Sequence, residues 1–240
     1  MQVFSCIDNT TLTATDTDAS VEAFCRHTLE FSPFRVAAVC VYPRFVAVAK
    51  HALQGSGIRV ASVAGAFPHG QLPLELKVEE VKYAIGQGAD EIDMVLSRGA
   101  LLAGDDDTVV REVQAMKEAC QEHTLKVILE TCELSSPTLV AHASQLAIDG
   151  GADFIKTSTG KGTAGATPQA AETMLSVIAE NVKKSGKKVG FKAAGGISTP
   201  EEALVYANLA KKILGEDFVK NQTFRIGASR LTDRLFSFLT

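Results

Sequence analysis

The segment "IDGGADFIKTSTGKG", residues 148–162, has the pattern of a short buried strand that ends in a charged side chain. Phe154 and Ile155 follow a Gly-Gly turn, Lys156 comes directly after them, and small or hydroxyl-bearing residues follow. A helix signal comes next, because Thr167-Pro168 combines an N-cap hydroxyl with proline at the first helical position. The segment therefore predicts a strand, a loop and a helix, in that order.

The same unit recurs along the chain. "GQGADEID", residues 86–93, shares the Gly-Ala-Asp entry into a strand with residues 151–153. Short apolar runs alternate throughout with stretches whose apolar residues are spaced three and four apart, as in amphipathic helices. The predicted strands are Val3–Ile7, Val36–Val41, Ile58–Val63, Glu91–Leu96, Leu125–Leu129, Asp153–Thr157, Val189–Lys192 and Phe224–Gly227, and the clearest helices are Leu74–Gly86, Thr108–Cys120 and Pro168–Val182.

Eight strand–helix units in 240 residues, without a linker or a low-complexity stretch, favour a closed (β/α)8 TIM barrel. We expect one domain over residues 1–240. The alternative is an open doubly wound sheet, which requires a glycine-rich turn after its first strand. Residues 8–12 read "DNTTL" at that point, so the barrel is the better prediction.

Composition excludes several classes of protein. A net charge of −4 provides no basic surface for nucleic acid or an anionic membrane. The apolar runs have the length of strands, far below the roughly 20 residues of a membrane span, and the first seven residues do not resemble a secretion signal. Five scattered cysteines without a CxxC pair indicate reduced thiols and a cytoplasmic protein. No local histidine or cysteine motif suggests a metal site. The oligomeric state stays open, and a homodimer is compatible with the sequence.

In a barrel of this kind the active site forms at the carboxyl ends of the strands. Two lysines on neighbouring strands would lower each other's pKa, and burial would lower both further, leaving a neutral amine able to form a Schiff base. A structural ion pair with Asp93 is the alternative role for Lys156. Asp93 suits both a counter-charge and a proton shuttle. Five polar residues are predicted at that end: Asp8, Cys40, Asp93, Lys156 and Lys192.

Glycine-rich loops follow the last three predicted strands. Backbone N–H groups in such loops bind phosphate oxygens, because glycine permits their close approach, and barrel phosphate sites commonly use the loops after strands seven and eight. A glycine pair alone marks only a turn, but three successive loops together with a lysine favour a phosphate site. The candidate residues are Gly160, Lys161, Gly195, Gly196, Ile197, Ser198, Gly227 and Ser229.

The segments "GADFIKTSTGK", "GFKAAGG", "ADEID", "CVYPRF" and "FPHG" together resemble class I deoxyribose-phosphate aldolase, over about residues 3–235. The resemblance implies that Lys156 forms the Schiff base, that Lys192 lowers its pKa and that Asp93 relays protons. It implies a substrate pocket that includes Asp8, Thr10, Cys40 and Thr159, the glycine loops as the phosphate site, and no metal or organic cofactor.

The implied reaction is the reversible cleavage of 2-deoxy-D-ribose 5-phosphate to D-glyceraldehyde 3-phosphate and acetaldehyde, a step of deoxyribonucleotide catabolism. Two alternatives stay open: a transaldolase-like Schiff-base transferase, which the paired lysines disfavour, and a non-catalytic protein that binds phosphorylated sugars. The chain also departs from the family's pattern. Arg230 follows the "GAS" segment, where a serine or another small residue is common.

Overall fold

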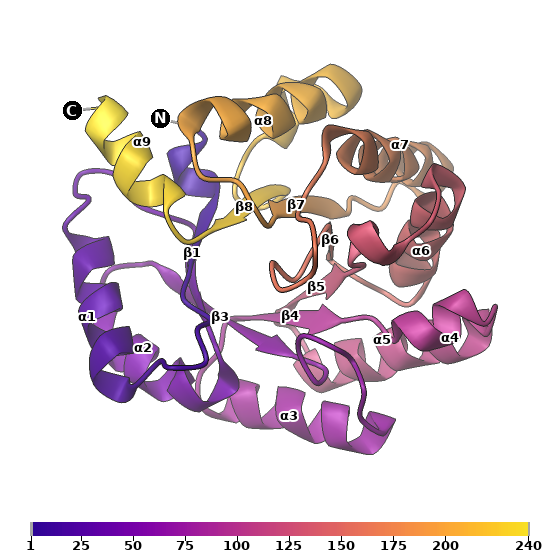
Figure 1. Cartoon of the computed structure of the whole chain (residues 1–240), viewed down its shortest axis with the longest axis horizontal. Coiled ribbons are helices and arrows are strands. Elements are labelled where there is room, and N and C mark those ends of the chain that lie inside the picture. Colours follow the sequence, from indigo (N-terminus) through magenta and orange to yellow (C-terminus); the bar gives the residue numbers. More distant parts are fainter. Residues whose placement is uncertain (1, 240) are drawn as a thin grey trace.

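Eight parallel strands pair in sequence order and close into a barrel, because β8 pairs with β1 as well as with β7 (Figure 1). The computed structural model of the protein describes residues 2–239. The closed barrel confirms the predicted fold class and excludes the open sheet. The strands are β1 (Ile7–Thr10), β2 (Ala38–Val41), β3 (Arg59–Ala64), β4 (Glu91–Val95), β5 (Thr124–Ile128), β6 (Phe154–Lys156), β7 (Gly190–Ala194) and β8 (Phe224–Ala228).

Helices surround the barrel on its outside, as Figure 1 shows. No helix within residues 2–239 is long and apolar enough to cross a membrane. The α-helices are α1 (Asp18–Leu29), α2 (Val46–Ala52), α3 (Leu74–Gly86), α4 (Arg98–Leu102), α5 (Asp106–Cys120), α6 (Pro137–Asp149), α7 (Pro168–Ser185), α8 (Pro200–Leu214) and α9 (Leu231–Leu239), and short 3-10 turns cover Phe4–Cys6, Pro43–Phe45, Thr131–Glu133 and Glu216–Phe218.

The predicted helix starts at Thr167-Pro168 and Thr199-Pro200 are confirmed. The Thr167 hydroxyl accepts a hydrogen bond from the N–H of Ala170, and the Thr199 hydroxyl accepts one from the N–H of Glu202. Each bond satisfies an N–H that the first helical turn cannot satisfy internally. These caps fix where α7 and α8 begin, and therefore the lengths of the loops after β6 and β7.

The prediction of a first strand at Val3–Ile7 is wrong. Residues Phe4–Cys6 form a 3-10 turn, and β1 begins at Ile7. Phe4 is buried by packing against the rings of Phe31 and Phe34, so its apolar character reflects a contact outside the sheet. As a consequence, Asp8 lies within β1, where the sequence suggested a turn after the strand.

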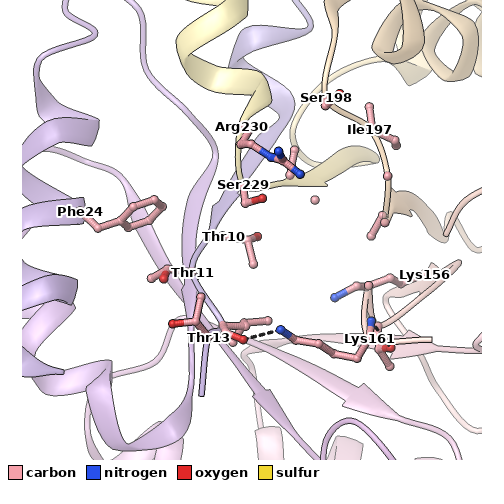
Figure 2. A pocket seen from close by; sticks show the side chains of 18 residues that line it. Thr10, Thr11, Thr13, Phe24, Lys156, Lys161, Ile197, Ser198, Ser229 and Arg230 are labelled. Carbon is pink, nitrogen blue, oxygen red and sulfur yellow. Dashed lines mark hydrogen bonds between the residues drawn. The ribbon is translucent and has the colours of Figure 1, made fainter. Parts of the chain in front are cut away.

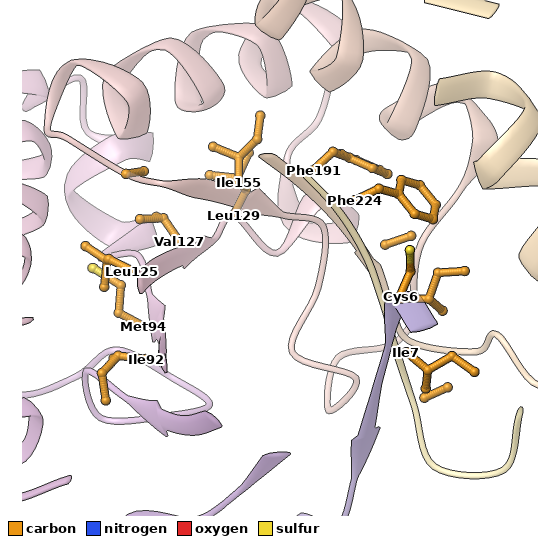
Figure 3. Close-up of a cluster of buried hydrophobic side chains, with 14 of the residues drawn as sticks. Cys6, Ile7, Ile92, Met94, Leu125, Val127, Leu129, Ile155, Phe191 and Phe224 are labelled. Carbon is orange, nitrogen blue, oxygen red and sulfur yellow. The ribbon is translucent and has the colours of Figure 1, made fainter. Parts of the chain in front are cut away.

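The apolar core lies mainly between the strands and the surrounding helices. Figure 3 shows Ile155 with side chains of the neighbouring strands, and the rings of Phe191 and Phe224, whose centroids are 6.2 Å apart. Because side chains alternate along a strand, Ile155 on the outside of β6 leaves Lys156 on the inside. The outer core therefore orients the charged side chains toward the barrel interior.

Candidate active site

Asp93 of β4 binds three ammonium groups. The Nζ atoms of Lys156 and Lys192 each lie 2.7 Å from its Oδ2 atom, and Nζ of Lys126 lies 2.7 Å from its Oδ1 atom. All four side chains are buried. Strand register brings them together, because Lys156 of β6 pairs with Lys192 of β7 and Asp93 pairs with Lys126 of β5. The expected meeting of Lys156, Lys192 and Asp93 is thus present in the structure.

A second group of charges connects to this one. Arg225 of β8 donates to Asp8 Oδ1 at 2.6 Å and to both oxygens of Glu91, at 2.6 and 3.0 Å. Asp8 also accepts a hydrogen bond from Lys192, and Lys126 lies 2.6 Å from Glu91. These contacts give Glu91, to which the sequence assigned no role, a place in one continuous buried network.

Sequence reasoning did not find Lys126 or Arg225, although a signal was present. Strands of parallel barrels are covered on both faces and read as nearly continuous apolar runs. Lys126 interrupts "LKVIL" and Arg225 interrupts "FRIG". A charged residue inside such a run predicts a buried ion pair, in the same way that Lys156 does.

The charges of the network do not balance. Four cations face three carboxylates inside the barrel: Lys126, Lys156, Lys192 and Arg225 against Asp8, Glu91 and Asp93. An unpaired buried charge is costly, whereas a neutral amine is not. Lys156 has one carboxylate partner while Lys192 has two, so Lys156 is the lysine that loses its proton most readily.

The pKa values of Lys156 and Lys192 are shifted in opposite directions. Burial lowers the pKa of Lys156, Asp93 opposes this shift, and the charge of Lys192 lowers the pKa further. Burial alone would also lower the pKa of Lys192, but Asp8 and Asp93 raise it above its ordinary value. The expectation that both pKa values are lowered is therefore confirmed for Lys156 and wrong for Lys192, because two carboxylates bind the latter. Three ammonium groups hold the pKa of Asp93 well below its ordinary value, although burial alone would raise it.

A cavity of about 510 Å³ reaches the network at Lys156 (Figure 2). Of the three interior lysines, only Lys156 lines it. Thr10 and Thr159 also line it, as predicted for pocket residues. Asp8 and Cys40, also predicted as pocket residues, are buried and do not line the cavity, and burial raises the pKa of the Cys40 thiol to about 11. All the predicted phosphate residues line the cavity: Gly160, Lys161, Gly195, Gly196, Ile197, Ser198, Gly227 and Ser229.

Two glycines of these loops are required for steric reasons. Gly195 has φ +89°, and a Cβ atom there would lie 2.8 Å from Cα of Gly165, which crosses it in the loop after β6. A Cβ atom on Gly227 would lie 3.0 Å from Cε of Lys192. Gly227 therefore leaves room for a lysine of the network in addition to lining the cavity.

Sequence reasoning also missed Glu130, which holds the loop after β6 in place. The hydroxyl of Thr159 donates to the buried carboxylate of Glu130, and the N–H of Lys161 donates to the same hydroxyl at 3.0 Å. Glu130 has φ +55°, a left-handed conformation uncommon for this residue type. Nζ of Lys161 then donates to the carbonyl of Leu12 at 2.6 Å. These hydrogen bonds connect the loop after β6 to Glu130, which follows β5, and to Leu12, which follows β1.

Removing the charge of Glu91 is expected to destabilise the fold. Glu91→Gln removes a buried carboxylate that pairs with both Lys126 and Arg225, and breaking a buried ion pair in this way costs about 3–5 kcal/mol. Urea unfolding measures the loss. The exposed pair of Glu22 and Arg26 provides the control, because Glu22→Gln should change stability by no more than about 0.5 kcal/mol. Equal losses for the two variants would contradict the prediction.

Comparison with known proteins places this geometry in a family. Residues 3–217 match the DeoC/LacD family aldolase model. The chain belongs to the DeoC/LacD aldolase family. The match covers every strand except β8. The resemblance to class I deoxyribose-phosphate aldolases noted in the sequence is therefore confirmed at the level of the family.

Solved structures resemble this DeoC/LacD aldolase along nearly its whole length. A deoxyribose phosphate aldolase from Aeropyrum pernix, described as tetrameric, is 29% identical, with 99% of this chain and 91% of that chain covered and a TM-score of 0.79. A candidate deoxyribose-phosphate aldolase from Coccidioides immitis is also 29% identical, with 98% and 85% covered and a TM-score of 0.85. A third, from Toxoplasma gondii, is 25% identical, with 98% and 94% covered and a TM-score of 0.88.

Proposed function

We propose that this aldolase reversibly cleaves 2-deoxy-D-ribose 5-phosphate to D-glyceraldehyde 3-phosphate and acetaldehyde through a Schiff base on Lys156. One observation carries the proposal: Lys156 is the interior lysine that both lines the cavity and has a lowered pKa. A neutral amine at the wall of a cavity can attack an aldehyde, whereas an ammonium bound by two carboxylates, such as that of Lys192, cannot.

The bond changes follow from this assignment. The amine of Lys156 adds to the C1 aldehyde of the open-chain sugar, and loss of water gives an iminium ion. The C3 hydroxyl then gives up its proton, the C2–C3 bond breaks, and its electron pair moves into an enamine on the enzyme. C3 leaves as the aldehyde carbon of glyceraldehyde 3-phosphate. Protonation of the enamine at C2 and hydrolysis of the resulting iminium release acetaldehyde and restore the amine.

Asp93 is the proposed proton relay. Its Oδ2 atom lies 2.7 Å from Nζ of Lys156, the atom at which the carbinolamine forms and decomposes. The lowered pKa keeps the carboxylate ionised, so it accepts the hydrogen bond from Nζ of Lys156 along which a proton would be relayed. Lys192 and Lys126 hold its two oxygens in place from the other sides. We therefore assign Lys192 and Lys126 to positioning and to the electrostatics of the site.

The loops after β6, β7 and β8 form the proposed phosphate end of the cavity. These loops, Lys161 and Lys156 line the same cavity, and the backbone N–H groups of the loops together with the charge of Lys161 would bind an anion there. The cavity thus offers an anion site at one end and a nucleophile at the other, as an acyclic aldehyde with a terminal phosphate requires. Asp8 contributes indirectly, because it pairs with Lys192 and Arg225 of the network, and Cys40 is buried and does not line the cavity. With this substrate and with reduced cysteines, we place the protein in the cytoplasm.

A coupled assay tests the reaction. The purified protein is incubated with 2-deoxyribose 5-phosphate as the only sugar, and acetaldehyde is measured through the oxidation of NADH by alcohol dehydrogenase. We expect acetaldehyde and glyceraldehyde 3-phosphate in equal amounts. Product formation that requires a second aldose as acceptor would instead indicate a transferase. Absence of product under both conditions would contradict the proposal and favour a non-catalytic sugar-phosphate binder.

A further inference from the structure

Arg230 lies between β8 and α9 and lines the cavity next to Ser229. Figure 2 shows its guanidinium and the amine of Lys156 entering the cavity from different sides. Within residues 2–239, the Arg230 guanidinium has no hydrogen-bond or ion-pair partner. The next arginine along the chain differs, because Arg234 donates to the carbonyl and hydroxyl oxygens of Ser198, at 3.3 Å each. Arg234 thus holds the loop after β7, while Arg230 keeps all its donors available.

The surroundings of Arg230 favour an anion. Within residues 2–239, the cavity is lined by the cations Lys161 and Arg230 and by the amine of Lys156, and by no aspartate or glutamate. One N–H of Lys161 is already used by the carbonyl of Leu12. A guanidinium stays charged at any physiological pH and presents a planar pair of donors that matches two phosphate oxygens at once. Arg230 is therefore the side chain of this cavity whose geometry best suits a terminal phosphate.

We propose that Arg230 binds the substrate phosphate directly and makes this enzyme selective for phosphorylated over unphosphorylated deoxyribose. This inference rests on the proposed function and adds to it a side chain that the mechanism does not otherwise use. A phosphate at this end leaves the aldehyde carbon free to reach Lys156. The selectivity is a difference in binding, so it acts on KM more than on the chemical step.

The test compares two substrates in variants of the full chain. Arg230→Met removes the charge and keeps the length of the side chain, and Arg230→Lys keeps the charge without the planar pair of donors. For Arg230→Met we expect kcat/KM with 2-deoxyribose 5-phosphate to fall about 10- to 100-fold, mainly through KM, as for the loss of a charged hydrogen-bonding group. With 2-deoxyribose the change should stay below about twofold. Arg230→Lys should recover part of the loss.

Arg44→Met is the matched control, because Arg44 is also exposed to solvent but pairs with Asp18 outside this cavity. It should change neither substrate preference nor KM. A fall of equal size on both substrates for Arg230→Met would show a structural role and overturn the proposal, as would no fall at all.

A second measurement separates this inference from the proposed function. Binding of inorganic phosphate to the wild-type protein and to Arg230→Met is measured by calorimetry, which requires no catalysis. Weaker phosphate binding by the variant supports the role of Arg230 even if the wild type cleaves no sugar, which would defeat only the proposed reaction. Equal phosphate binding by both proteins overturns the role of Arg230 and leaves the proposed reaction standing.

Discussion

Lys156→Met is expected to lower kcat by at least about four orders of magnitude, because it removes the proposed nucleophile and no other interior lysine lines the cavity. The decisive measurement is covalent trapping. Sodium borohydride reduces the imine formed with acetaldehyde to an N-ethyl lysine, which peptide mapping locates. In the wild type we expect the ethyl group on Lys156, within residues 154–161.

Lys161→Met is the control for the trapping experiment. It removes another cation of the same cavity but retains the nucleophile, and acetaldehyde carries no phosphate for Lys161 to bind. This variant should still be labelled at Lys156. An ethyl group on Lys192 in the wild type, or undiminished labelling of the active site in Lys156→Met, would show that the nucleophile has been assigned to the wrong residue.

Lys192→Leu is expected to have the second largest effect, on both the pH profile and the stability. The charge of Lys192 lowers the pKa of Lys156, so its removal raises that pKa. The fraction of free amine at a given pH below the pKa falls tenfold for each unit of increase. Activity at neutral pH should therefore drop, and the acid limb of the kcat/KM profile should move to higher pH. Folding stability should fall by about 3–5 kcal/mol, because Asp8 and Asp93 lose a buried partner.

Lys77→Leu separates these two effects. Lys77 of α3 is also a buried lysine, paired with Glu112 of α5 and hydrogen-bonded to Ser97, but it lies in the helical layer outside the barrel. Its loss should destabilise the protein by a similar amount and leave the pH profile unchanged. If Lys192→Leu also leaves the profile unchanged, Lys192 has a structural role only and does not tune Lys156.

The site shows which functional residues local sequence patterns identify and which they miss. Lys156, Lys192 and the glycine loops were recognisable because each departs from the pattern around it: a charge at the end of an apolar run, or glycines where a strand gives way to a helix. Lys126, Glu130 and Arg225 carry the same kinds of signal, yet their partners lie on other elements of the fold, far along the chain. Arg225, for example, contacts Asp8, which lies 217 positions earlier in the chain, and Glu91, which lies 134 positions earlier.

The sequence by itself determined the alternation of strands and helices, the starts of α7 and α8, the closed barrel as the better architecture and Lys156 as the candidate for the reactive lysine. These features follow from periodicity, caps and motifs, which act over a few residues. Only the tertiary structure decided where β1 begins, which carboxylates hold which lysine and which of the two lysines has the lowered pKa. Those properties depend on burial and on distances of a few ångströms between side chains of different strands. Closure of the barrel buries these side chains and brings them together, as it does for Asp8 and Lys192, which are 184 residues apart in the chain.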